Sequence, residues 1–399
     1  MAPFLLLYRL AIAVMAQALF RNDMTRVNFI LIAEQSAERF CDRKTLLSVS
    51  SRLHDSIEIS TAVESLNARC PLLRKIPMAK YRYHLPQLDG ELFLTDGGLE
   101  TTLIFHEGID LPYFAAFDLL KDAMGRAALE RYYRTYLKIA QRFRTGFVLE
   151  SPTWRAHADW GELLGYSTEA LAEANRQAIQ LMMSLGQDYD THQTPIVISG
   201  CIGPRGDGYV ADSAMSSQEA AAYHLPQIQA LAKSGADLVS AMTINYAEEA
   251  IGIVQAAQQA DIPVVISFTL ETDGCLPTGQ SLAAAISRVD AATAAYPAYY
   301  AVNCAHPTHF AIASSKDETV RDRLQGLRAN ASRMSHAELD AADELDDGNP
   351  SQLGQEYIEL KQAFPALNVL GGCCGTDHRH VEKVAAACQS LFPSLVLTN

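Results

Sequence analysis

Short apolar runs alternate with longer amphipathic stretches from residue 91 to the carboxyl end of the chain. Runs of this length, bounded by glycine, proline and polar residues, are typical of strands buried on both faces. Eight such runs are candidate strands: Glu91–Thr95, Gly146–Glu150, Pro195–Ser199, Asp237–Met242, Pro263–Phe268, Tyr299–Asn303, Gly326–Asn330 and Ala366–Leu370. Helix-forming sequence separates most of them from one another.

The intervening stretches have the apolar spacing of amphipathic helices. Ser216-Ser-Gln-Glu219 has the pattern of a capping box and predicts a helix that ends near Gly235, with Pro226 as a kink. Further helices are predicted at Met124–Phe143, Ser167–Leu185, Ala247–Ala260, Gln280–Ala295 and Gln352–Phe364, and a last one from Asp377. The acidic segment Ser335–Pro350 predicts a loop with a short helix. This pattern predicts an α/β fold, a (β/α)8 TIM barrel over residues 78–399.

Residues 1–77 lack this alternation and carry no cluster of reactive side chains. We interpret them as an N-terminal extension, disordered in part or non-native, with Met78 at the start of the barrel. Arg9 interrupts the apolar stretch Met1–Phe20, and neither half reaches the roughly 20 apolar residues of a membrane span. We therefore predict neither a signal peptide nor a membrane anchor.

The composition narrows the class of protein. With 49% hydrophobic and 20% charged residues the chain is similar to soluble enzymes, and its net charge of −14 argues against a nucleic-acid surface. Eight cysteines in 399 residues do not make a disulfide framework, which favours metal-binding or catalytic thiols in the reducing cytoplasm. We expect small-molecule substrates and no nucleic-acid or membrane partner. The composition leaves open whether the chain forms a homo-oligomer.

Reactive side chains follow the predicted strands at their carboxyl ends, where (β/α)8 barrels carry their chemistry. They are Asp96 at the first strand, Glu150 and Thr153 at the second, Cys201 at the third, Cys304 at the sixth, Asn330 at the seventh, and Cys373 and Cys374 at the eighth. Arg328 interrupts the apolar pattern of the seventh predicted strand, so this strand has the weakest support.

Two adjacent cysteines, Cys373 and Cys374, stand between the last strand and a helix. Neighbouring thiolates favour a soft metal but cannot complete a tetrahedral site, and Cys304 ends another strand in the same way. Three thiolates with an open fourth position describe a catalytic zinc ion, Zn2+. Four nearby histidines are candidates for a further ligand: His306, His309, His378 and His380. Two other interpretations stay open: buried thiols in a tight turn, and a phosphate cradle at Gly371-Gly372.

Three segments resemble the signature segments of the homocysteine S-methyltransferase family: Thr95-Asp-Gly-Gly-Leu-Glu-Thr101, Val302-Asn-Cys304 and Gly371-Gly-Cys-Cys-Gly-Thr376. The resemblance covers roughly residues 91–390, and its cysteine motif is specific. It implies a zinc-containing barrel in which the three cysteines bind the metal and a thiol substrate takes the open position. Coordination to zinc deprotonates a thiol, which gives a nucleophile for an electrophilic methyl group.

The resemblance also implies residues for substrate binding. Asp96 matches an aspartate that holds the substrate's amino group, and the backbone amide of Gly97 would face the substrate's carboxylate. Thr153 matches a threonine that helps to grip the amino acid. Asn303, next to a metal-binding cysteine, is a further candidate contact.

The match to the family fails at the fourth strand. The family usually has a glutamate there as a second anchor for the substrate's ammonium group, whereas this chain has Met242 in Ala241-Met-Thr-Ile244. Loss of such a charge-assisted hydrogen bond costs roughly 1.5–3 kcal/mol, or ten- to a hundredfold in affinity. Glu150 and Glu100 are candidates to replace the lost anchor.

We therefore predict a zinc-dependent S-methyltransferase. The expected donor is a sulfonium or ammonium compound, with S-methylmethionine favoured, and the expected acceptor is homocysteine, which would become methionine. One alternative keeps the zinc barrel but changes the acceptor to a different thiol or a selenol, because of Met242. Another is a barrel that binds a thiol or an amino acid with little catalysis.

Overall fold

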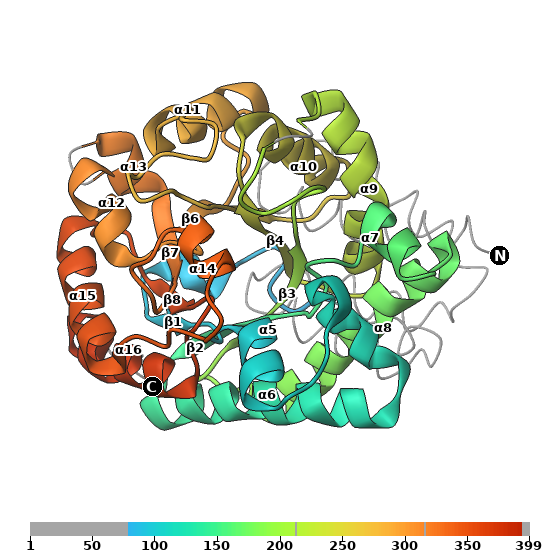
Figure 1. The fold of residues 1–399 in the computed structure, drawn as a ribbon, viewed down its shortest axis with the longest axis horizontal. Coiled ribbons are helices and arrows are strands. Elements are labelled where there is room, and N and C mark those ends of the chain that lie inside the picture. The colour runs from blue at the N-terminus through green and yellow to red at the C-terminus, as the bar shows by residue number, and fades with distance from the viewer. Residues whose placement is uncertain (1–78, 212–213, 315–316, 393–399) are drawn as a thin grey trace, which may run out of the picture. The chain divides into compact units, whose positions relative to one another are not determined.

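The computed structural model describes residues 79–211, 214–314 and 317–392. The predicted N-terminal extension, residues 1–77, lies outside them. The described residues belong to one compact unit, residues 78–399, in which eight parallel strands close into a barrel in chain order. Figure 1 shows the strands at the centre and the helices around them. This is the (β/α)8 barrel that the sequence predicts.

The eight strands are short and coincide with the eight predicted runs. They are β1 Phe93–Leu94, β2 Gly146–Glu150, β3 Ile196–Ile202, β4 Leu238–Ile244, β5 Val264–Phe268, β6 Tyr299–Asn303, β7 Leu324–Ala329 and β8 Val369–Gly372. The predicted bounds of β2 and β6 are confirmed. Strand β3 continues further toward its carboxyl end than predicted, which carries Cys201 into the sheet, and β4 continues past Met242 to Ile244.

Strand β8 lies later in the chain than the predicted run Ala366–Leu370. Its two glycines, Gly371 and Gly372, pair with Arg328 and Ala329 of β7 instead of ending the strand. A side chain at Gly371 would collide with the side chain of Thr95, so the close approach of β1 requires glycine there. The predicted strand ended before these glycines, and the sheet uses them as tightly packed strand residues.

The helices surround the barrel as the sequence predicts, with four additions. They are α5 Leu99–Thr101, α6 Ala123–Phe143, α7 Ala158–Leu163, α8 Thr168–Gln187, α9 Ser217–Lys233, α10 Ala247–Gln259, α11 Leu282–Thr293, α12 Pro307–Ser314, α13 Glu318–Arg323, α14 His336–Asp340, α15 Pro350–Ala363 and α16 His378–Cys388. The capping box at the start of α9 is confirmed, since the Ser216 and Glu219 side chains each accept from the other's backbone N–H. Helices α5, α7, α12 and α13 are short and were not predicted.

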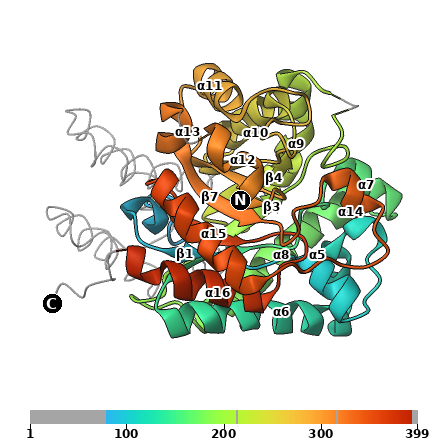
Figure 2. The ribbon, with the colours of Figure 1, turned by 60° about the vertical axis from the view of Figure 1, so that its left-hand side comes forward.

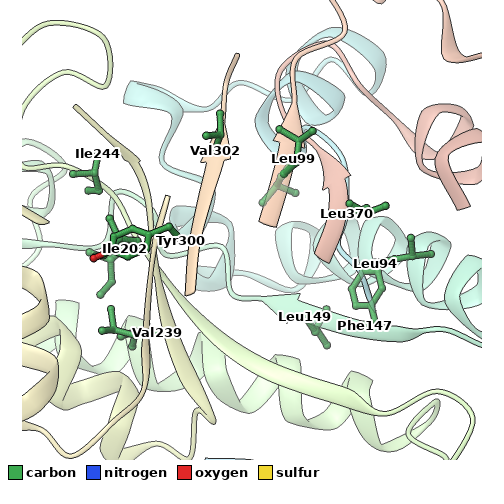
Figure 3. Close-up of a cluster of buried hydrophobic side chains, with 14 of the residues drawn as sticks. Leu94, Leu99, Phe147, Leu149, Ile202, Val239, Ile244, Tyr300, Val302 and Leu370 are labelled. Atoms are coloured by element: carbon green, nitrogen blue, oxygen red, sulfur yellow. The ribbon is translucent and has the colours of Figure 1, made fainter. Parts of the chain in front are cut away.

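Buried apolar side chains form two clusters on the two sides of the barrel wall. One lies between the sheet and the helices, and Figure 3 shows part of it, including Leu149, Val239 and Leu370 from different strands. The other fills the barrel interior and consists of Leu85, Phe93, Val148, Val197, Leu238, Val265, Tyr299, Ala301 and Val369. Two separate apolar faces explain why most of the strands read as continuous apolar runs.

The barrel interior becomes polar toward the carboxyl ends of the strands. Because alternate strand residues face the same side, the residue two positions after an inward apolar residue also faces inward. By this rule Glu150, two positions after Val148, and Ser267, two positions after Val265, face the barrel interior. Both side chains are buried. Figure 2 shows α5, α7 and α14 together at one end of the barrel, and each belongs to a loop that follows a strand.

Among the described helices, none combines the length and the apolar character that a membrane span requires.

Candidate metal centre

Three cysteine side chains meet at the carboxyl end of the barrel. Cys304 directly follows β6, and Cys373 and Cys374 directly follow β8. Their sulfur atoms lie within 4.8 Å of one another, and no other group of three or more such ligands occurs in the described part of the chain. Cys304 is buried and the other two are partly exposed, so the cluster can be reached from the mouth. The structure thus brings together the three residues that the sequence predicts as metal ligands.

The donor set fits a zinc ion. Zinc binds thiolates at about 2.3 Å in tetrahedral geometry, which places two sulfur ligands about 3.8 Å apart. The observed sulfur separations, all within 4.8 Å, need only small movements of the side chains to reach this value. Three sulfur ligands leave one tetrahedral position for a substrate.

The free thiols share their protons unequally. Hydrogen bonds from the thiols of Cys373 and Cys374 hold the pKa of Cys304 well below its ordinary value. The same hydrogen bonds with Cys304 raise the pKa of Cys373 to about 12 and that of Cys374 well above its usual range. Cys304 is therefore the thiol of the three that gives up its proton most readily.

Asn303 organises the backbone and the sulfur atoms around Cys304. Its Oδ1 accepts from Thr243 N at 2.8 Å and from Ser267 Oγ at 2.7 Å. Its Nδ2 donates to Thr243 Oγ1 at 2.8 Å and to Cys304 Sγ at 3.2 Å. Asn303, predicted as a substrate contact, is thus bound by protein groups and lies against a predicted metal ligand.

The backbone at this point is strained. Thr243 and Cys304 have φ angles of 62° and 54°, which lie in the left-handed region. A residue other than glycine in this region is destabilised by about 1–3 kcal/mol. Both of these residues are hydrogen-bonded by Asn303. Such strain is typical of sites where the surrounding structure holds a functional geometry.

Tyr209 covers the cysteine cluster from the loop after β3. Its hydroxyl lies 3.9 Å from Cys374 Sγ, and its ring stacks on His336 with 4.0 Å between the ring centroids. His336 in turn lies 2.6 Å through Nε2 from the backbone oxygen of Cys304. The sequence analysis singled out neither Tyr209 nor His336, because neither stands in a recognisable motif.

Arg328 of β7 connects two of the predicted substrate residues across the barrel mouth. Its Nη1 donates to Glu150 at 2.5 Å and its Nη2 donates to Asp96 at 2.6 Å. Two backbone oxygens accept further bonds, Gly97 O from Nη2 at 3.1 Å and Gly372 O from Nε at 3.0 Å. Arg328 was the interruption in the predicted strand, and it is an inward-facing residue of the site.

Ion pairs hold Arg328, Asp96 and Glu150 together in one cluster. Burial raises the pKa of Glu150 to about 7 and raises that of Asp96, while Arg328 opposes both shifts. Burial also opposes the charge on Arg328, yet the two carboxylates raise its pKa well above its usual range. Tyr132 donates to the second Asp96 oxygen at 3.0 Å, so both oxygens of Asp96 accept from protein donors.

Two other predicted substrate residues lie in the wall of the mouth. The Thr153 hydroxyl donates to Cys201 O at 2.7 Å, and its side chain is fully buried. Met242 is also buried, and its backbone oxygen accepts from Trp154 Nε1 at 3.3 Å. Because inward-facing Leu238 precedes it by four residues, Met242 gives this side of the mouth an apolar surface.

The four histidines near the cysteines take other roles. His306 contacts Thr308 and lies 3.2 Å from Glu356, His309 contacts Arg333 O, and His380 contacts Asp377. His378 is exposed, and within the described residues none of the four joins the cysteine cluster.

The phosphate-cradle interpretation is disfavoured by the cap of α16. The side chain of Asp377 accepts from Arg379 N at this helix start, which places a carboxylate where a phosphate would bind.

Glu100 in α5 is a half-buried carboxylate near Cys373. Throughout the described ranges it has no ion pair and no hydrogen bond from another residue. Burial raises its pKa to about 7, because the charged carboxylate loses its hydration. A raised carboxyl pKa stabilises the folded state below the unfolded pKa of 4.5, and this stabilisation is lost as pH rises through 7.

We therefore expect Glu100→Gln to raise the free energy of unfolding of the reduced, metal-free protein by about 1–3 kcal/mol at pH 8.5. At pH 4.5 the change should be small. Urea unfolding at both pH values measures the difference. Glu162→Gln, at an exposed glutamate, is the matched control, and an equal gain there would contradict a specific role for Glu100.

Comparisons with known proteins agree with this geometry. A family model described as homocysteine S-methyltransferase matches residues 93–388. The chain is 23% identical over 252 residues to Homocysteine S-methyltransferase YbgG of Bacillus subtilis (strain 168), an overlap of 57% of this chain and 76% of that protein.

Two solved structures of the homocysteine methyltransferase MmuM from Escherichia coli have a similar fold. The oxidized form has a TM-score of 0.59 and 19% identity, and the match covers 74% of this chain and 95% of MmuM. The metallated form has a TM-score of 0.60 and 17% identity, with 75% and 97% covered. At these identities the likeness shows the barrel fold.

Proposed function

Because the chain belongs to the homocysteine S-methyltransferase family, and is a methyltransferase, we propose that it uses zinc to methylate a thiol, with homocysteine as the first candidate acceptor. The observation that carries the proposal is the meeting of Cys304, Cys373 and Cys374 at the barrel mouth. YbgG and MmuM are both named for homocysteine, and one MmuM structure is described as metallated, which supports the acceptor and the metal.

The three cysteines would hold the zinc ion and leave its fourth position for the acceptor. When bound, zinc lowers the pKa of a thiol ligand, so that the acceptor is a thiolate at neutral pH. Asn303 donates to Cys304 Sγ and fixes the position of that ligand. Tyr209, whose hydroxyl lies 3.9 Å from Cys374 Sγ, would limit the space around the acceptor sulfur. A separate protein base for the thiol is then unnecessary.

We propose a sulfonium or ammonium compound as the methyl donor, with S-methylmethionine favoured. A cationic donor suits a centre whose three thiolate charges exceed the charge of a zinc ion by one. In the transfer, the acceptor sulfur forms a bond to the methyl carbon while the bond from this carbon to the donor sulfur or nitrogen breaks. The acceptor becomes a neutral thioether, and the donor keeps the electron pair and loses its positive charge.

The test is methionine formation from homocysteine with S-methylmethionine, S-adenosylmethionine and betaine offered separately. We expect activity with one donor, its loss after chelation, and its recovery when zinc is added back. Full activity after complete removal of metal would exclude the proposed role of zinc. If homocysteine and a panel of other thiols and selenols all stay unmethylated, the proposed methyl acceptor class is wrong.

A second candidate keeps the metal site but uses a different thiol or a selenol as acceptor. Two observations favour it: Met242 stands where the family usually has a glutamate, and Arg328 already pairs with Asp96. Asp96 is the residue expected to hold the amino group of homocysteine, and this group would have to compete with a buried guanidinium.

Met242→Glu tests where the ammonium group of homocysteine lies. If it lies beside β4, the variant should bind homocysteine ten- to a hundredfold more tightly, because a charge-assisted hydrogen bond is worth roughly 1.5–3 kcal/mol. Calorimetric titration of the zinc-loaded protein measures the change. Met242→Gln is the control of similar size without charge and should gain less. An unchanged Kd in the glutamate variant would count against this position for the ammonium group.

A further inference from the structure

Two arginines of the barrel mouth differ in how their charges are balanced. Arg328 makes four hydrogen bonds and pairs with two carboxylates. Arg155, in the loop after β2, is only 6% exposed. Within the residues that the structure describes, no carboxylate lies within the 4.0 Å of an ion pair from Arg155. Arg155 is therefore a buried cation that makes no ion pair with the described residues.

The contacts of Arg155 fix its position but leave most of its donors unused. Its guanidinium carbon lies 3.9 Å from the ring centroid of Trp154 and 4.0 Å from that of Trp160. Aromatic faces attract the charge but accept no hydrogen bonds in the guanidinium plane. Nη1 donates to Gly206 O at 2.9 Å, and Nε is buried with no partner in the described structure. A guanidinium has five N–H donors, so this arginine retains a free donor edge.

Arg155 belongs to the mouth that contains the cysteines. Its neighbour Trp154 donates to Met242 O, at the predicted ammonium position. Its acceptor Gly206 lies in the loop that carries Tyr209, whose hydroxyl is 3.9 Å from Cys374 Sγ. Burial lowers the pKa of Arg155 to about 10, and the negative charges of Asp207 and Glu100 oppose the shift, so Arg155 is charged at neutral pH.

We propose that Arg155 binds a carboxylate of a methyl-transfer substrate and selects for substrates that carry one. An unpaired buried cation is unfavourable, and a carboxylate would supply both the missing charge and two acceptor oxygens. The planar donor edge of a guanidinium matches a carboxylate in a two-point hydrogen bond. The carboxylate belongs either to the thiol acceptor or to the methyl donor. This inference rests on the proposed function, because it concerns a substrate of that reaction.

The test compares substrates that differ only in the carboxylate. The acceptors are homocysteine and 3-mercaptopropan-1-amine, which is homocysteine without its carboxylate. The donors are S-methylmethionine and its decarboxylated sulfonium analogue. We measure kcat/KM for each combination with the zinc-loaded wild type, Arg155→Gln and Arg155→Lys, and with Arg205→Gln as a matched control. Arg205 is an exposed arginine of the same mouth that pairs with Asp159 at 2.8 Å.

We expect Arg155→Gln to lower kcat/KM about ten- to a hundredfold for the substrate whose carboxylate it binds, and to change it less than about twofold for the decarboxylated partner. Arg155→Lys should fall between, since it keeps the charge without the planar edge. If Arg155→Gln no longer distinguishes the two acceptors, Arg155 binds the carboxylate of the acceptor. If it no longer distinguishes the two donors, Arg155 binds the carboxylate of the donor. Arg205→Gln should keep the wild-type selectivity.

Equal losses for all substrates would give Arg155 a structural role and overturn the proposal. If Arg155→Gln does not fold, as judged by circular dichroism and metal content, the wild type decides, because equal kcat/KM with and without the carboxylate overturns the proposal. Failure of the proposed function looks different, since the wild type then methylates no thiol. In that case calorimetric titration compares the affinities of the same four compounds. Equal affinities with and without the carboxylate overturn the proposal for Arg155.

Discussion

Arg328→Met is expected to lower the free energy of unfolding by about 3–5 kcal/mol at pH 7.5, because it leaves Asp96 and Glu150 buried without their shared cation. The loss should be smaller at pH 5, since buried carboxyl groups whose pKa is raised take up protons there. Urea unfolding of the reduced, metal-free protein at the two pH values measures both effects.

The control for this prediction removes the carboxylates together with the cation. Asp96→Asn and Glu150→Gln, combined with Arg328→Met, leave no unpaired charge in the cluster, so most of the lost stability should return. A loss of less than about 1 kcal/mol in Arg328→Met would show that water or another cation reaches the two carboxylates. A triple variant as unstable as the single variant would point to lost packing of the arginine instead of lost charge.

Cys373→Ala is expected to abolish stoichiometric zinc binding and to reduce methyl transfer about a thousandfold or more. Removal of one of three ligands breaks the site, and the lost activation of the acceptor thiol corresponds to several kcal/mol in the barrier. Metal analysis by mass spectrometry and a methionine-formation assay on the same reduced samples measure the two effects.

Cys201→Ala is the matched control for the cysteine prediction. Cys201 is a buried cysteine on strand β3, and its sulfur lies outside the cluster. We expect this variant to keep one zinc ion and most of its activity. Unchanged zinc content in Cys373→Ala would contradict the three-cysteine site, and equal zinc loss in both variants would indicate a general effect on folding.

The barrel and its cysteines could be predicted from the sequence because their signals are local. Each strand is a short apolar run, and Cys304, Cys373 and Cys374 stand directly after two of these runs. The carboxyl ends of parallel strands meet at one end of a barrel, so the fold alone brings the cysteines to the same end. The late position of β8 was missed because its glycines are used for close packing against Thr95, which only the closed sheet reveals.

The charge pairing of the site could not be predicted, because it depends on contacts between distant parts of the chain. Arg328 and Asp96 are 232 positions apart, and no local pattern connects them. The available signal was the inward phase of Arg328 on β7 together with acidic residues after β1 and β2. Arg155 gave a weaker signal, because its unused donors become visible only when its contacts with the other described residues are known.

The position of Arg328 also affects how the barrel closes between its first and last strands. Strand β8 pairs with β1, so the first and last strands of the barrel form the seam at which the sheet closes. Arg328 reaches from β7 across this seam to the residues that follow β1 and end β2. The three clustered cysteines follow β6 and β8, which both lie on one side of this seam. A polypeptide still being synthesised therefore cannot assemble either the ion-pair cluster or the thiol cluster until its last strand has joined the ring, and a truncated chain would have neither.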